Sequence, residues 1–108
     1  MMPPNVSFVV PSDGGIATEG TVEIHGHSLH ILDDDALNLM EQPSGRKVDC
    51  PTKMETFDEG DLTSDQPGSF QVRCVLTIDV SLLPNGSYAL QLNLLSGIHS
   101  SGFEVRHA

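Results

Sequence analysis

The stretch Phe70–Val80, which reads FQVRCVLTIDV, decides the fold. Polar side chains fill its odd positions, with Val75 as the apolar exception, and every even position is apolar: Phe70, Val72, Cys74, Leu76, Ile78 and Val80. Successive side chains of a β-strand point to opposite faces, whereas a helix would spread these residues around its circumference. The pattern therefore predicts a long strand with one face in a core and the other face in water.

The same alternation recurs on both sides of this stretch. Ser87–Leu95 and Thr21–Gly26 are predicted strands, and weaker strands are predicted at Asn5–Val10, Ala36–Met40, Arg46–Cys50 and Gly102–Arg106. About seven strands, separated by turn signals and without a helical period, predict an all-β, antiparallel β-sandwich. The predicted core consists of Val22, Ile24, Phe70, Val72, Cys74, Leu76, Ile78, Tyr88, Leu90, Leu92, Phe103 and Val105.

Length and charge restrict the function. A chain of 108 residues is the size of one domain, so residues 1–108 are expected to form a single sandwich, cut from or part of a longer chain. The formal net charge is -10, and the five Lys and Arg are scattered, so direct binding to nucleic acid or to an anionic membrane is not expected. The N-terminus lacks the cationic and apolar regions of a secretory signal, which favours a cytoplasmic location, with export in a longer secreted chain as the alternative.

Two features of the connections leave alternatives open. Cys50 and Cys74 are the only thiols, and they would form either a disulfide in an oxidising compartment or two free, small apolar side chains. The connection Pro51–Ser69 is rich in acidic residues and is expected to be an exposed loop, with a turn of helix or an edge strand around Met54–Phe57.

Histidines and acidic residues supply candidate metal ligands. His25 and His27 would project from the same side of a strand, and together with His30 and Asp33 they could satisfy zinc. Asp33–Asp35 and the acidic loop from Asp58 to Asp65, with Asp58 and Asp61 as candidates, suggest calcium, although neither segment follows the spacing of the loop that wraps one calcium ion. A solvated polar surface explains both groups as well, so neither a metal nor another cofactor is expected.

Two motifs carry a resemblance to a known family. Gly20–Leu29, reading GTVEIHGHSL after a proline-glycine turn, resembles the opening of immunoglobulin-like domains of the IPT/TIG type. Leu83–Leu90, reading LPNGSYAL, is similar to the corner of many such sandwiches, where a tyrosine hydroxyl tethers the chain. Over nearly its whole length the chain resembles the immunoglobulin-like domain of unknown function that follows an HU-like DNA-binding domain in Bacteroidetes proteins. The resemblance implies an immunoglobulin-like sandwich and assigns no functional residue.

These observations lead to an expected function. We expect a non-catalytic accessory or protein-interaction module of a larger bacterial protein, in which a neighbouring domain would handle DNA. Its partner would be a protein or a domain of the same chain, and the outward apolar residues Val75 and Leu95 are candidate contacts. The oligomeric state is not predicted. An exported adhesion or carbohydrate-binding module, assisted by calcium, is the alternative.

Enzymatic activity is not expected. Gly86–Tyr88 does not form a nucleophile elbow, and the sequence contains no glycine-rich motif that would cradle a phosphate.

Overall fold

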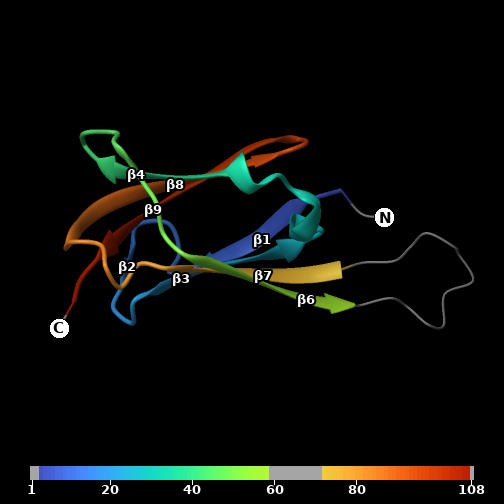
Figure 1. The fold of residues 1–108 in the computed structure, drawn as a ribbon, viewed down its shortest axis with the longest axis horizontal. Coiled ribbons are helices and arrows are strands. Elements are labelled where there is room, and N and C mark those ends of the chain that lie inside the picture. The colour runs from blue at the N-terminus through green and yellow to red at the C-terminus, as the bar shows by residue number, and fades with distance from the viewer. Residues whose placement is uncertain (1–2, 59–71, 108) are drawn as a thin grey trace, which may run out of the picture.

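The protein folds as an open β-sandwich of two packed sheets (Figure 1). The computed structural model describes residues 3–58 and 72–107. Its strands are β1 (Asn5–Val10), β2 (Gly15–Ala17), β3 (Thr21–His27), β4 (Leu37–Gln42), β5 (Lys47–Val48), β6 (Thr52–Asp58), β7 (Val72–Asp79), β8 (Gly86–Leu94) and β9 (Gly97–Val105). One sheet has the order β1-β3-β7-β6 and the other β2-β9-β8-β4-β5. The predicted all-β sandwich is confirmed.

The strand bounds refine the sequence prediction. All seven predicted strands are present, and the residues around Met54–Phe57 form an edge strand, β6, which was one of the two alternatives. The prediction missed β2, a three-residue strand that pairs in parallel with β9, because so short a segment carries no alternation. Residues 59–71, which include most of the predicted acidic loop and Phe70, lie outside the described residues. Among the described residues, no helix is long and apolar enough to cross a membrane.

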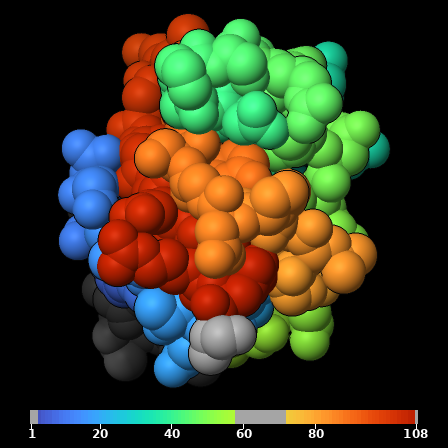
Figure 2. All heavy atoms as spheres, turned by 90° about the vertical axis from the view of Figure 1, so that its left-hand side faces the viewer, coloured from blue at the N-terminus to red at the C-terminus, as the bar shows by residue number. Residues whose placement is uncertain are grey.

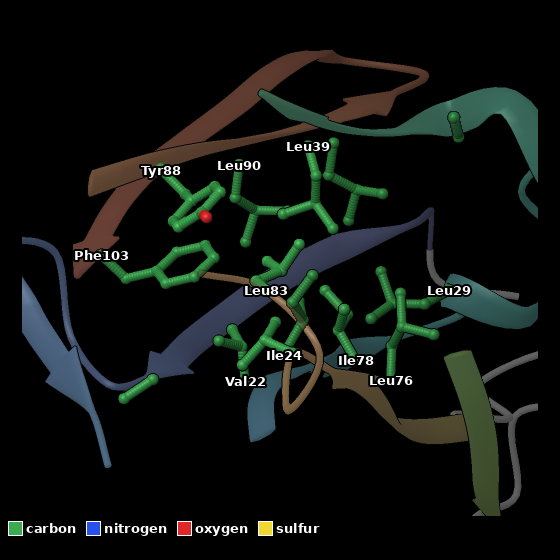
Figure 3. Packing of buried hydrophobic residues seen from close by; sticks show 14 of the residues in the cluster. Val22, Ile24, Leu29, Leu39, Leu76, Ile78, Leu83, Tyr88, Leu90 and Phe103 are labelled. Atoms are coloured by element: carbon green, nitrogen blue, oxygen red, sulfur yellow. The ribbon is translucent and has the colours of Figure 1, made fainter. Parts of the chain in front are cut away.

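The core lies between the two sheets, where their apolar faces meet. Every predicted core residue within the described range is buried. In Figure 3, Ile24 and Ile78 of the four-stranded sheet point toward Leu90 of the five-stranded sheet. Tyr88 and Phe103 stack with ring centroids 5.8 Å apart. Burial of each large aliphatic side chain contributes roughly 1.5–3 kcal/mol, so the inward residues of β3, β7 and β8 each stabilise the fold.

Two close approaches of the backbone help to hold the first strands in place. A Cβ atom at Gly26 of β3 would collide with the carbonyl oxygen of Asn5, so only glycine allows β1 to pair this closely. The connection between β1 and β2 crosses from one sheet to the other. There the Gly102 N–H donates to Asp13 Oδ1 at 2.7 Å, and the Gly14 N–H donates to the Gly102 carbonyl at 2.9 Å. These hydrogen bonds attach the connection between β1 and β2 to β9.

One end of the sandwich is closed by the turn between β7 and β8. The Tyr88 hydroxyl donates to the Pro84 carbonyl at 2.7 Å, as the resemblance implied for this corner. The His107 backbone N–H donates to Asn85 Oδ1 at 2.9 Å, and its ring Nε2 lies 2.6 Å from the Leu83 carbonyl. Figure 2 shows the C-terminal residues, in red, beside this turn, in orange. The turn is therefore bound both to β8 and to the segment that follows β9.

Candidate interaction surfaces

The first two predicted metal ligands lie on the outer face of the four-stranded sheet. His25 and His27 project from the same side of β3, as expected, because the inward positions of this strand are Val22, Ile24 and Gly26. His25 Nε2 lies 2.8 Å from Glu23 Oε1, and its ring stacks on Phe8 with centroids 4.3 Å apart. His25 is therefore engaged by a carboxylate and an aromatic ring of the same face.

The remaining predicted ligands do not join them. His30, in the 3-10 turn η1 (Leu29–Ile31), places Nδ1 3.6 Å from the sulfur of Cys74, whose side chain faces the core. Asp33 precedes the turn η2 (Asp34–Ala36). Within residues 3–58 and 72–107, no three His, Cys, Asp or Glu side chains gather in a way that could hold a metal ion. The predicted zinc set is thus not assembled, because β3 ends between His27 and His30 and the chain turns toward the core.

The calcium hypothesis concerns residues that the structure does not fully describe. Asp58 ends β6, but its side chain is outside the description, and Asp61 lies in residues 59–71. The described residues therefore do not test whether Asp58 and Asp61 bind calcium.

The two cysteines are free and far apart. Cys74 pairs in register with Thr56, and Cys50 lies six residues before Thr56, which corresponds to roughly 20 Å of extended chain. A disulfide requires Cα atoms no more than about 7 Å apart, so this register does not bring the pair together. Burial raises the pKa of the Cys50 thiol, and the carboxylates of Asp79 and Asp49 raise it further. Of the two alternatives, the structure has the free thiols.

Val75, a predicted protein contact, lies in the middle of the outer face. Its neighbours in register are His25 of β3 and Glu55 of β6. Phe8 lies beside His25 and is 54% exposed, and Phe57 is 38% exposed under the Arg73 guanidinium, which lies 4.2 Å from the ring centroid. We call the surface of Phe8, His25, Val75, Phe57 and Arg73 the outer face. The sequence predicted Val75 alone, and the pairing of four strands adds the aromatic neighbours.

Leu95, the second predicted contact, belongs to a different surface. It is 79% exposed at the turn between β8 and β9, where Ile98 is also exposed. Leu95 and Ile31 line a shallow hollow at this end of the five-stranded sheet. Val75 and Leu95 therefore do not form one patch.

A groove of about 410 Å³ opens on the side of the sandwich between β6 and the edge of the other sheet. Its lining combines apolar side chains with polar and acidic ones and comes from both sheets, from the 3-10 turns and from the connection between β5 and β6: Leu29, His30, Leu32, Asp33, Asp34, Ala36, Leu37, Leu39, Val48, Asp49, Cys50, Thr52, Met54, Leu76 and Leu92. We call this the side groove. Sequence reasoning missed it because its residues come from separate segments, and each segment alone gives no signal beyond apolar alternation.

Comparisons with known proteins do not add a family to this description. No protein-family model matches the chain, and no curated protein matches it. The function is therefore inferred from the fold and from these surfaces.

Proposed function

We propose that this chain is an immunoglobulin-like domain that serves as a non-catalytic protein-interaction module. The strand order β1-β3-β7-β6 corresponds to the ABED sheet of such domains, and β9-β8-β4 corresponds to their GFC sheet, with one short strand added at each edge. The hydrogen bond from Tyr88 to the Pro84 carbonyl corresponds to the tyrosine corner at the start of strand F. Both features support the immunoglobulin-like assignment, which by itself implies no chemistry.

The outer face is the single observation that carries the interaction role. Aromatic and arginine side chains are enriched at the energetic centres of protein interfaces, and this face presents Phe8, Phe57 and Arg73 around Val75. Phe8 is held against His25 and Phe57 against Arg73, so less side-chain freedom is lost when a partner docks. A preorganised, partly apolar face of this kind suits a protein partner.

Charge supports an accessory role beside another domain. With a net charge of -10, the domain would repel a polyanion, so any DNA contact of the full protein falls to a basic neighbour. Within this proposal the domain is part of a larger bacterial protein, and the free thiols agree with a cytoplasmic location.

Site-specific photocrosslinking tests this function. A photoreactive amino acid is placed at Phe8 or at Phe57 in cells that naturally make the protein, and the control carries it at Leu82, which is 89% exposed on the turn between β7 and β8. We expect discrete protein adducts from the two outer-face positions, weakened when Phe8→Ser accompanies the probe at Phe57, and none of these adducts from Leu82. Equal labelling from all three positions, or no adduct from the outer face, would contradict the proposal.

A further inference from the structure

β6 is the edge of its sheet, because in the described residues it pairs with β7 alone. The Asp79 N–H donates to the Pro51 carbonyl at 2.9 Å, and this bond determines which residues of β6 direct their backbone groups toward β7. Residues of an antiparallel strand direct their N–H and C=O groups alternately to the two sides. The odd-numbered residues of β6 therefore bond to β7, and Thr52, Met54 and Thr56 direct their N–H and C=O groups away from the sheet.

The side chains of the same three residues lie on the face of the sheet that packs on the core, although all three are exposed at this edge. In register they lie opposite Ile78, Leu76 and Cys74, all of which are buried. Side chains of paired residues on adjacent strands share one face of the sheet. A new strand added beside β6 would therefore point every second side chain into the space between the two sheets.

The side groove occupies that space. Thr52 and Met54 of β6 line it from one sheet, and Leu39 of β4 and Leu92 of β8 line it from the other. In Figure 1, β6 and β4 belong to opposite layers of the sandwich, and the connection from β5 to β6 runs between the layers. Apolar side chains of an added strand thus have a place already bounded by apolar residues, and the volume of about 410 Å³ is in the range of preformed binding pockets.

Charge selects among the segments that could occupy the groove. Asp33 and Asp34 line it from η2 and the residue before it, and Asp49 lines it from the connection between β5 and β6. Lys53 of β6 lies on the opposite side of the strand, 3.7 Å from Glu55. Carboxylates at the rim favour Lys and Arg in the occupant and oppose acidic residues.

We infer that the side groove and the free edge of β6 bind an extended peptide segment of a partner protein by strand addition. The segment carries apolar residues at alternate positions and is flanked by Lys or Arg. Backbone hydrogen bonds to Thr52, Met54 and Thr56 supply affinity, and the groove and its acidic rim supply specificity. This inference rests on the proposed interaction role and adds to it a second site, separate from the outer face, with a defined ligand chemistry.

Synthetic peptides test the ligand chemistry. The first probe is Lys-Lys-Val-Thr-Val-Thr-Val-Lys-Lys, the second contains the same residues with the three valines grouped together, and the third replaces every lysine by glutamate. Titration calorimetry on the complete chain should give at least tenfold tighter binding for the first probe than for either control, weakening as salt rises. Equal binding of the first two probes, or no binding of the first at millimolar concentration, would overturn the inference.

Cys50 reports where the peptide binds, because its half-buried thiol lines the groove. Saturation with the first probe should slow iodoacetamide alkylation of Cys50 several-fold, as followed by mass spectrometry, and the glutamate peptide should leave the rate unchanged. Binding without protection of Cys50 would place the peptide elsewhere and overturn the inference.

A proline substitution separates strand addition from simple apolar contact. The N–H of Thr56 faces the open side, so Thr56→Pro removes a donor for the added strand without removing a bond to β7. We expect at least tenfold weaker peptide binding for Thr56→Pro, unchanged binding for the control Thr56→Val, and unchanged folding by circular dichroism. Should Thr56→Pro unfold, Met54→Lys replaces it, because a cation in the groove repels the lysine-flanked probe. Unchanged binding in the folded variant would overturn the inference.

The remaining outcomes separate this inference from the proposed function. If the peptides fail but the outer-face crosslinks persist, strand addition is wrong and the interaction role stands; if the crosslinks fail too, both are wrong. A concentration-dependent dimer in sedimentation that Thr56→Pro abolishes would assign the edge to a second copy of this chain and overturn the peptide ligand.

Discussion

The closed end of the sandwich and its grooved side are built from the same two sheets but are completed differently. At the closed end, Tyr88 and His107 bind the carbonyl groups of the β7–β8 turn, and Phe103 stacks on Tyr88 beneath it. On the grooved side, β6 has alternate backbone groups directed away from the sheet, and apolar side chains of both layers line an open groove. The first region uses its polar groups in internal hydrogen bonds, whereas in residues 3–58 and 72–107 the outward backbone groups of β6 pair with no other strand.

This difference separates residues that hold the fold from residues that serve recognition. Side chains at the closed end and in the core are buried or hydrogen-bonded, so their substitution should act on stability. The β6 side chains of the grooved side, such as Met54, are exposed, so their substitution should act on binding with little effect on folding. The following predictions test this division, beginning with the largest effect.

Leu90→Ala should produce the largest loss. Leu90 is fully buried between the sheets, and its truncation leaves a cavity that should cost about 3 kcal/mol of unfolding free energy. The matched variant on the grooved side is Met54→Ala, which should cost about 1 kcal/mol or less because Met54 is already partly exposed. Urea denaturation followed by circular dichroism measures both variants. Equal losses would mean that the grooved side contributes to the core as much as the sheet interior.

Gly26→Ala should be nearly as damaging. The added methyl group would meet the carbonyl oxygen of Asn5, so β1 must shift, at a cost of about 2 kcal/mol. Gly102→Ala in the other sheet is the control, since a Cβ there makes only ordinary contacts. Thermal melts should show a clear drop for the first variant and little change for the second. A tolerated Gly26→Ala would contradict the close pairing of β1 with β3.

Tyr88→Phe should have a moderate effect. It removes the hydrogen bond to the Pro84 carbonyl and keeps the ring in the core, so we expect a loss of about 1 kcal/mol. Ser87→Ala, at an exposed neighbouring position, should leave stability unchanged. Urea titration compares the pair. If both variants had the same unfolding free energy as the parent chain, the hydrogen bond from Tyr88 would not contribute to stability, and packing alone would hold the turn.

The titration of Cys50 should give the smallest effect. Burial and the nearby carboxylates of Asp79 and Asp49 raise its pKa, so alkylation should reach half its maximal rate at a higher pH than for an ordinary thiol. The folded pKa exceeds the unfolded one, so this group's contribution to stability is complete below the unfolded pKa and is lost as the pH rises toward the folded pKa. Asp79→Asn should shift the alkylation profile to lower pH. A profile at the ordinary thiol position would contradict a half-buried Cys50.

The sequence predicts the positions of some residues of the candidate surfaces but not of others. The outward position of Val75 follows from period two alone, because it breaks the polar alternation of β7. Its neighbours Phe8 and Phe57 come from β1 and β6, and only strand order and register bring them to the same face. The position of His30 also depends on the tertiary structure, since its place in the sequence near His25 and His27 did not predict that its Nδ1 lies 3.6 Å from the sulfur of Cys74.

Local alternation along the chain is enough to establish the β-sandwich and its core. Strand identity and burial both follow from this alternation, so the pattern alone places Val22, Leu76 and Leu92 in the core. The side groove and the free thiols depend instead on strand order and register. Strand order and register come from the packing of segments far apart in the chain, and that packing leaves no local pattern in the sequence.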